Sequence, residues 1–214
     1  MRKMMGWMVL MALFLWLAGC EKQTVYAKPM KLPKNARVAT FAGGCFWCMQ
    51  PPFDKLKGVL STSVGYAGGP EKNPTYKQVA YGRTGHTEAI QVIYDPRKVS
   101  YQKLLKVFWQ NINPTQVNGQ FYDRGRQYRT AIFFHSAKQR KQALATKALL
   151  NKSGCFKKPI AVEITKAGPF YHAEKYHQKY YKKKPYHYKR YRIGSGRDAY
   201  IKIRWGACKV FRKK

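Results

Sequence analysis

The sequence predicts an α/β or α+β sandwich, of which we expect the α+β class, with helices packed on a mixed β-sheet. Segments rich in β-branched and aromatic residues alternate with segments whose apolar residues recur at helical spacing. Alternation of this kind is typical of helices that cover a sheet. The part of the chain after residue 35, about 180 residues, is long enough for a single domain with its own core. It contains no internal repeat, so we expect one compact domain.

Each expected strand is a short run with alternating or continuous apolar residues. The strands are expected at 36–41, 87–94, 129–135 and 159–166. Three of the four expected helices have a capping residue or a helix breaker at one end, which are Ser100, Gly154 and Pro185. The helices are expected at 45–57, 100–112, 137–151 and 171–183. The two remaining long stretches, 58–85 and 113–127, read as irregular loops, which usually serve function in a compact domain.

The first 35 residues are expected to lie outside the fold. Two basic residues precede an apolar run over 7–17, which is shorter than the roughly 20 residues of a membrane span. The run ends in Leu17-Ala18-Gly19-Cys20, which resembles a bacterial lipobox. This pattern predicts a signal peptide at 1–19 and a lipidated tether at 20–35 that begins at Cys20. The folded domain then occupies residues 36–214.

The lipobox pattern also predicts where the protein is located. Glu21, rather than an aspartate, follows Cys20, which favours the outer membrane facing the periplasm over retention in the inner membrane. A plain membrane anchor and an ordinary secretory signal are the alternatives.

The chain is extremely basic. It has 42 Lys and Arg against 9 Asp and Glu, a net charge of +33, and many of the basic residues stand among tyrosines over 180–191. Such a region can bind nucleic acid through phosphate contacts and stacking. An exported lipoprotein has little access to nucleic acid, so we expect a solvated basic surface attracted to anionic envelope components instead.

The segment Gly43-Gly44-Cys45-Phe46-Trp47-Cys48 stands where a strand turns into a helix. A helix N-terminus presents unpaired N–H groups and partial positive charge, both of which favour a thiolate. The spacing of Cys45 and Cys48 lets one thiol attack the other once that other is oxidised. No second Cys or His pair accompanies them, which disfavours zinc, and we expect no metal. The alternative is a pair of buried structural cysteines.

The order of motifs over residues 37–205 resembles the A-type peptide-methionine (S)-S-oxide reductases. The resemblance is carried by short motifs in the order and spacing of that family. They are Gly44-Cys45-Phe46-Trp47, Gly58-Val59, Gly65-Tyr66-Ala67-Gly68-Gly69, Asn73-Pro74-Thr75-Tyr76, Gly85-His86-Thr87-Glu88-Ala89, Tyr94-Asp95-Pro96, Phe108-Trp109, Asn113-Pro114-Thr115, Gly119-Gln120, Asp123-Arg124-Gly125, Gln127-Tyr128-Arg129, Phe170-Tyr171, Ala173-Glu174, His177-Gln178 and Tyr180. The resemblance implies a ferredoxin-like (split βαβ) sandwich with long irregular loops.

The resemblance also implies an activity, the thiol-dependent reduction of the S epimer of methionine sulfoxide, free or in proteins. Cys45 would attack the sulfoxide sulfur and become a sulfenic acid, which is then converted to an intramolecular disulfide. Glu88, raised in pKa by apolar surroundings, would supply the proton, with hydrogen bonds from Tyr76 and Tyr128 to the oxygen. The implied substrate-binding residues are Phe46, Trp47, Asp123, Tyr180 and Tyr188.

The remaining implications concern partners. No cofactor is expected, because an external dithiol such as thioredoxin or a thioredoxin-like protein would reset the enzyme. The protein would act as a monomer on oxidised envelope proteins.

The chain departs from the best-known members of that family at the resolving cysteine. Those members carry glycine where this chain has Cys48, and a cysteine where this chain has Lys189. Cys48 is therefore the expected resolving residue, with Cys208 and then Cys155 as runners-up.

Two other functions stay open at this point. One is a thioredoxin-like disulfide oxidoreductase, which would have no use for Glu88, and the other is a non-enzymatic cationic lipoprotein of the envelope.

Overall fold

The computed structural model describes residues 33–211. The predicted signal peptide, Cys20 and most of the predicted tether lie outside the described residues. None of the helices in the described part is long and apolar enough to cross a membrane. The strands are β1 (Arg37–Gly43), β2 (Val59–Ala67), β3 (Thr87–Tyr94), β4 (Gly119–Gln120), β5 (Asp123–Arg124), β6 (Thr130–Phe134), β7 (Glu163–Lys166) and β8 (Phe170–His172).

The helices are short, apart from one of sixteen residues, and several begin at a side-chain cap. The hydroxyls of Thr75, Ser100 and Ser136 each accept a hydrogen bond from a backbone N–H of the first turn. The helices are α1 (Phe46–Asp54), α2 (Tyr76–Ala80), α3 (Tyr101–Trp109), α4 (Ala137–Lys152), α5 (Tyr180–Lys183), α6 (Pro185–Gly194) and α7 (Arg197–Tyr200), with a 3₁₀ turn η1 (Arg126–Tyr128) and a π-helical turn η2 (Ile201–Trp205).

Six strands form one mixed sheet in the order β7-β6-β1-β3-β2-β8. β1 lies between β3 and β6 and is antiparallel to both, and β2 is antiparallel to β3. β7 joins β6 as a parallel strand, which makes the sheet mixed. The mixed α+β architecture expected from the sequence is therefore present. The register sets Glu88 of β3 directly opposite Tyr66 of β2.

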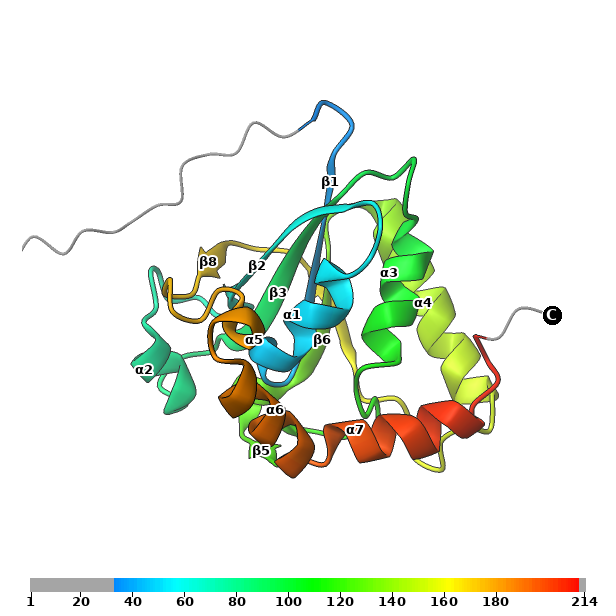
Figure 1. The fold of residues 1–214 in the computed structure, drawn as a ribbon. Coiled ribbons are helices and arrows are strands. Elements are labelled where there is room, and N and C mark those ends of the chain that lie inside the picture. Colours follow the sequence, from blue (N-terminus) through cyan, green and yellow to red (C-terminus); the bar gives the residue numbers. More distant parts are fainter. Residues whose placement is uncertain (1–32, 212–214) are drawn as a thin grey trace, which may run out of the picture. The chain divides into compact units, whose positions relative to one another are not determined.

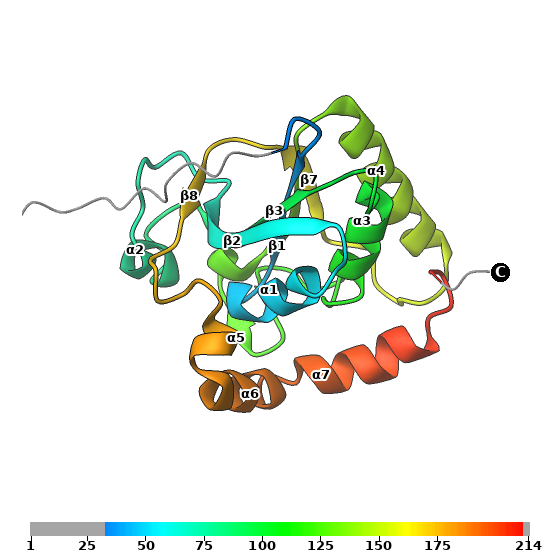
Figure 2. The same cartoon turned by 45° about the horizontal axis from the view of Figure 1, so that its top comes forward.

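One face of the sheet carries the main core. Side chains that alternate along β1 and β3, among them Phe41, Ile90 and Val92, pack against α1, α3 and α4. Phe41 stacks between Phe53 of α1 and Phe108 of α3, with ring centroids 5.3 and 5.1 Å apart. Figures 1 and 2 show these three helices against the sheet. The other face carries a smaller cluster of mostly alanine side chains.

Two of the expected elements differ in the structure. The stretch 58–85, expected to be a loop, contains β2, whose Val64 and Tyr66 are fully buried in the sheet. The stretch 171–183, expected to be a helix, forms the edge strand β8 and a series of turns before α5 begins at Tyr180. The Gln178 side chain explains the second difference, because its amide exchanges hydrogen bonds with the backbone N–H and C=O of Val64.

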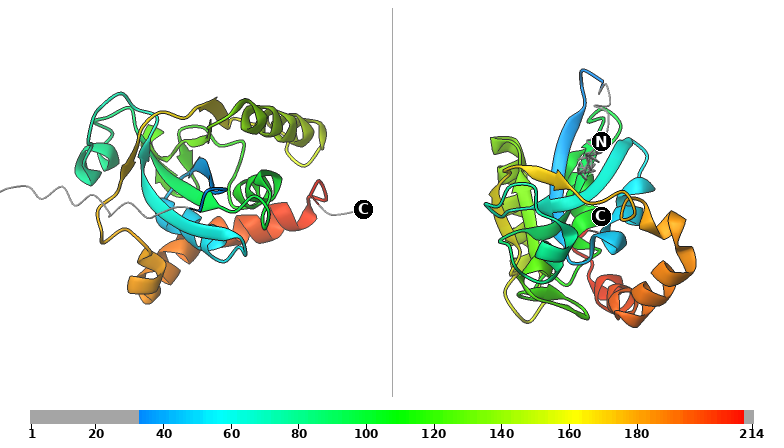
Figure 3. Two further views of the ribbon diagram at one scale, coloured as in Figure 1. Left: turned by 90° about the horizontal axis from the view of Figure 1, so that it is seen from above. Right: turned by 90° about the vertical axis from the view of Figure 1, so that its left-hand side faces the viewer.

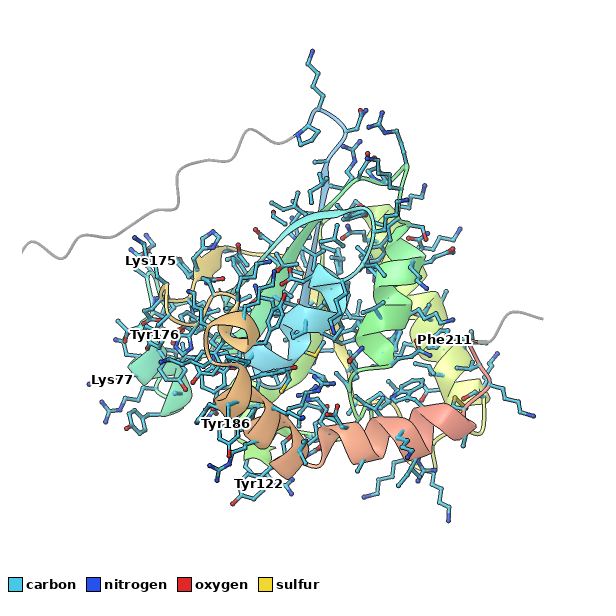
Figure 4. The ribbon with its side chains drawn as sticks, in the orientation of Figure 1. Lys77, Tyr122, Lys175, Tyr176, Tyr186 and Phe211 are labelled. Atoms are coloured by element: carbon cyan, nitrogen blue, oxygen red, sulfur yellow. A yellow bond between two sulfur atoms is a disulfide. The ribbon has the colours of Figure 1, made fainter. Side chains whose placement is uncertain are left out.

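The residues after 184 form an arm that lies along one side of the domain. The arm consists of α6, α7 and η2, and Figure 3 shows it on the same side of the sheet as α1. Trp205 is buried in the main core, and a disulfide joins Cys208 to Cys155, beyond the end of α4. Figure 4 places Phe211 at the end of the described arm and Tyr186 on its outer surface, and Tyr186 is 75% exposed. Buried contacts thus hold the C-terminal end of the arm against the domain.

Candidate active site

The two glycines before Cys45 let β1 turn sharply into α1. Gly44 has a φ of +77°, and a Cβ at that position would lie 2.4 Å from Cβ of Gln120. Only glycine meets both requirements. The turn leaves Cys45 as the N-cap of α1, followed directly by Phe46.

Cys45 and Cys48 lie in the first turn of α1, and both are free thiols in the structure. Cys45 is 6% exposed and Cys48 is fully buried. A hydrogen bond joins the two side chains, and it raises the pKa of Cys45, as burial does to a greater extent. The same bond is the main cause that lowers the pKa of Cys48 to about 7, with help from the positive charges of Arg197 and Arg192. The negative charge of the pair is therefore stabilised on Cys48, whereas the sequence led us to expect it on Cys45.

Glu88 is a carboxyl group in an apolar row. It occupies the first core-facing position of β3, in line with Ile90 and Val92, and is only 2% exposed. Its Oε2 accepts a hydrogen bond of 2.9 Å from the backbone N–H of Phe46, at the start of α1. Burial raises the pKa of Glu88 to about 8, although this hydrogen bond opposes the rise. Glu88 is therefore largely protonated at neutral pH and can donate a proton.

A small pocket brings most of the predicted residues together. Its volume is about 80 Å³, which is the space of a few heavy atoms, since one water occupies about 30 Å³ of the liquid. Burial keeps the pKa of Tyr76 and of Tyr128 well above its usual range, so both hydroxyls stay protonated and can donate hydrogen bonds. The lining residues are Cys45, Phe46, Trp47, Tyr76, Glu88, Asp123, Tyr128 and Tyr191.

The Trp47 ring is fixed in the wall of this pocket. Tyr180 stacks on it at 3.9 Å between centroids with an interplanar angle of 7°. Its indole N–H donates to Nδ1 of His177 at 2.9 Å, and burial lowers the pKa of His177 to about 4. Neutral His177 therefore acts as the acceptor for Trp47. Tyr180, which we expected to bind substrate, does not line the pocket, and it contacts the pocket wall through its stacking on Trp47.

Asp123 reaches the pocket from β5 and is held by Tyr191. The Tyr191 hydroxyl donates to both carboxylate oxygens of Asp123, at 2.7 and 2.6 Å. Tyr191 takes the place that we expected for Tyr188. Tyr188 instead lines a neighbouring cavity of about 360 Å³ between α1 and α6.

The disulfide between Cys155 and Cys208 changes the expectation for the resolving thiol. Cys208 and Cys155 were the runners-up, but here each is bonded to the other and neither is a free thiol. Cys48 is the remaining free cysteine in the described part of the chain besides Cys45. It is also the cysteine that hydrogen-bonds to Cys45.

Several residues at the site had no assigned role at the level of sequence. Glu174 accepts hydrogen bonds from the Tyr66 hydroxyl, at 2.7 Å, and from the Tyr76 backbone N–H, at 2.9 Å, and so fixes the start of α2. Glu174 and His177 stood within the quoted motifs, which was a signal that could have been used. Arg197 stood in none of these motifs. Its contact with α1 depends on how the arm folds back against the domain. No group of three or more His, Cys, Asp or Glu residues suited to a metal ion occurs within residues 33–211.

Comparison with known proteins identifies relatives of this chain. The family model described as peptide methionine sulfoxide reductase matches residues 37–209. The chain is 54% identical over 175 residues to a peptide methionine sulfoxide reductase MsrA of Bacillus licheniformis, covering 82% of this chain and 97% of that one. It is 53% identical over 176 residues to the MsrA of Bacillus subtilis, covering 82% and 99%.

Solved structures show the same similarity. The reduced form of Mxr1 from Saccharomyces cerevisiae matches with a TM-score of 0.69 and 32% identity, covering 74% of this chain and 92% of that one. Methionine sulfoxide reductase A of Corynebacterium diphtheriae matches with a TM-score of 0.64 and 34% identity, covering 72% and 77%. A structure of Mxr1 in complex with Trx2 is similar in fold, at 24% identity and a TM-score of 0.50. The chain belongs to the peptide methionine sulfoxide reductase family of the MsrA type and is a thiol-dependent reductase of methionine sulfoxide.

Proposed function

We propose that Cys45 attacks the sulfur of the S epimer of methionine sulfoxide and that Cys48 then resolves the oxidised enzyme. The observation that carries the proposal is the 80 Å³ pocket, which combines a thiol, a protonated carboxyl group and two tyrosine hydroxyls. A methyl sulfoxide needs an apolar wall for its methyl group and donors for its oxygen. Phe46 and Trp47 supply the wall.

In the first step, Cys45 Sγ bonds to the sulfoxide sulfur. Its proton passes to the Cys48 thiolate along the hydrogen bond between the two side chains. The sulfoxide oxygen takes a proton from Glu88 while Tyr76 and Tyr128 donate hydrogen bonds to it. The oxygen then moves to Cys45 Sγ, and the bonds of the substrate sulfur to that oxygen and to Cys45 Sγ both break, which releases methionine and leaves Cys45 as a sulfenic acid. Two electrons have moved from the thiol to the substrate.

In the second step, Cys48 Sγ attacks the sulfur of the Cys45 sulfenic acid. The S–O bond breaks, water leaves, and a Cys45–Cys48 disulfide forms. An external dithiol then reduces that disulfide and is itself oxidised. The complex of Mxr1 with Trx2 supports a thioredoxin-like protein as this reductant. Asp123, oriented by Tyr191, would accept a hydrogen bond from the substrate's backbone.

The test is turnover of the two purified epimers of methionine sulfoxide with dithiothreitol. We expect wild-type enzyme to reduce the S epimer and leave the R epimer unchanged. Cys45→Ser should show no reduction of either, because a serine hydroxyl is a hard nucleophile with a high pKa. Turnover of the R epimer, or turnover by Cys45→Ser, would reject the assignment.

We further propose that the enzyme is a lipoprotein anchored through Cys20 to the outer membrane, where it repairs envelope proteins. The lipobox pattern supports this location, and so does the Cys155–Cys208 disulfide, since such bonds persist mainly in oxidising compartments. Cys20→Ala should move the protein from the membrane fraction to the soluble fraction or leave its first 19 residues uncleaved. Wild-type protein found in the cytosol with those residues intact would contradict the location.

We also propose that the central strands form a ferredoxin-like arrangement. The order β6-β1-β3-β2 supports it, because β3 lies between β1 and β2, the two strands that α1 connects, and β1 lies between β3 and β6, which α3 connects.

A further inference from the structure

The arm formed by α6, α7 and η2 sends two arginines toward the segment that carries both cysteines. Arg192 Nη1 donates a hydrogen bond of 3.0 Å to the carbonyl oxygen of Cys48. Arg197 Nη2 donates one of 3.0 Å to the carbonyl oxygen of Gly43, and its Nη1 lies 3.5 Å from Sδ of Met49. The two guanidinium groups therefore contact the chain on both sides of the pair of thiols.

Arg197 is a buried cation without a carboxylate partner. It is 1% exposed, and its hydrogen bonds go to neutral acceptors, which include the carbonyl oxygen of Asn111 at 2.6 Å. Its guanidinium carbon lies 4.5 Å from the centroid of the Phe121 ring. Its Nε finds no hydrogen-bond partner among the described residues, and no ion pair of Arg197 occurs there either. Arg192, by contrast, pairs with Asp198 at 2.7 Å.

A buried charge without a counterion is costly, so an anion nearby should compensate Arg197. The charge of Arg197 favours the anionic form of two groups, the Asp123 carboxyl and the Cys48 thiol. Burial alone would raise the pKa of Cys48, yet the bond from Cys45 and the charges of Arg197 and Arg192 lower it to about 7. Asp123 acts in the opposite direction.

Other titratable groups also act on Cys48 or are acted on by it. Glu88 of β3 lies close enough for the Cys48 charge to raise its pKa, and it is largely neutral at pH 7. The phenols of Tyr188 and Tyr191 on α6 likewise feel the Cys48 charge and have pKa values raised by burial, so both are neutral. The cations that face Cys48 are therefore Arg192 and Arg197.

We propose that Arg192 and Arg197 are positioning residues that hold Cys48 as a thiolate, so that Cys48 is the leaving group when the reductant opens the Cys45–Cys48 disulfide. This inference rests on the proposed resolving role of Cys48. In the disulfide state the Cys48 anion is gone, and Asp123 is the anion that remains to interact with Arg197. Reduction restores the Cys48 anion, so these arginines favour the reduced enzyme. Disulfide exchange is also faster when the departing thiol has a low pKa.

The burial of the two sulfurs decides which of them the reductant attacks. Cys45 lines the substrate pocket and is 6% exposed, whereas Cys48 is 0% exposed. A thiolate of the reductant therefore attacks Cys45 Sγ through the pocket that admits methionine sulfoxide. The Cys45–Cys48 bond breaks, its electron pair goes to Cys48 Sγ, and a mixed disulfide joins Cys45 to the reductant. The second thiol of the reductant then attacks its own bonded sulfur, which releases Cys45 and leaves the reductant oxidised.

The first experiment measures thiolate absorbance at 240 nm against pH in the full chain carrying Cys45→Ser. Cys48 is then the free thiol of the described domain, and the serine hydroxyl can still donate a hydrogen bond to it. We expect a midpoint near pH 7. Adding Arg197→Met or Arg192→Gln should raise the midpoint toward about 8.5, the value of an ordinary thiol, without reaching it, because the hydrogen bond from residue 45 remains.

Two matched controls accompany these variants. Arg190→Met removes one positive charge from the same helix as Arg192, but Arg190 is exposed and lies over the Tyr186 ring, so the midpoint should not move. Arg197→Lys keeps the buried charge and should largely restore the midpoint. An unchanged midpoint in Arg192→Gln overturns the proposal even if Arg197→Met fails to fold.

The second experiment traps the mixed disulfide. Enzyme oxidised by methionine sulfoxide is mixed with thioredoxin whose second active-site cysteine is replaced by serine, and the linked peptides are identified by mass spectrometry. We expect the link at Cys45, with Cys48 left as a free thiol, and a link at Cys48 would overturn the proposal. If the oxidised wild-type enzyme contains no Cys45–Cys48 bond at all, the resolving role of Cys48 fails instead, which separates the two inferences.

Discussion

Replacing Glu88 with glutamine should make the enzyme nearly inactive and, in alkaline solution, more stable. Glu88 is a carboxyl group buried in the apolar row of β3. Burial there favours the neutral form of the side chain over the charged form. Glutamine has nearly the same shape, and its side-chain oxygen can still accept the hydrogen bond from the Phe46 N–H. The variant therefore removes the proton donor and the buried charge together, without removing a side chain from the core.

The size of the stability effect follows from the pKa. Burial raises the pKa of Glu88 from its ordinary value of 4.5 to about 8. The folded protein thus keeps a proton that the unfolded chain loses, and its stability falls as the pH rises from 4.5 to 8. At one pKa unit per 1.36 kcal/mol, the ionised carboxylate costs at most about 5 kcal/mol above pH 8 and about 3 kcal/mol at pH 7. Below pH 4.5 the two proteins should have similar stability.

The assay is urea unfolding at pH 4.5, 7 and 9, with a single-turnover measurement of methionine release alongside. Glu88→Gln should gain stability over the parent as the pH rises, and its first turnover should fall by about 10²-fold or more, because it lacks general-acid help. Glu163→Gln is the control, since the Glu163 side chain is about half exposed and does not line the pocket. A Glu88→Gln enzyme that is less stable than its parent at pH 9, or that keeps its first turnover, would refute this reasoning.

Three further predictions concern the thiols and the pocket. Cys48→Ser should release one methionine per enzyme and then stall with thioredoxin, which a rapid-quench experiment can show; continued turnover would mean that another thiol resolves Cys45. Cys155→Ser should lower the free energy of unfolding by about 2–4 kcal/mol, since the bond closes a loop of 53 residues, yet keep the burst and the turnover; loss of turnover in the folded variant would give that disulfide a catalytic part. Tyr191→Phe should free the Asp123 carboxylate and raise KM for sulfoxide-containing peptides more than it lowers kcat, and an unchanged KM would remove Asp123 from substrate binding.

Sequence reasoning succeeded where the determining pattern was local. The glycines, the aromatic pair and the two-residue spacing of Cys45 and Cys48 predicted a strand-to-helix turn with two thiols in its first helical turn. Sequence reasoning failed for β2, because the many glycines and turn residues of 58–85 are typical of a loop. The strand forms there because it pairs with β3. It also failed for 171–183, where the bonds of Gln178 to a distant strand decide the conformation.

The sequence by itself determined the type of reaction, because the order of motifs along the chain indicates the family. It also provided a second cysteine, Cys48, close to Cys45. Only the tertiary structure decided which residues surround the thiols. Tyr191 rather than Tyr188 binds Asp123, Cys208 pairs with Cys155, and Arg197 approaches α1 from more than 140 residues away in the chain. The physical reason is that contacts between the arm and α1 set the burial of the thiols, the charges around them and the orientation of the neighbouring side chains. No local sequence pattern encodes such contacts.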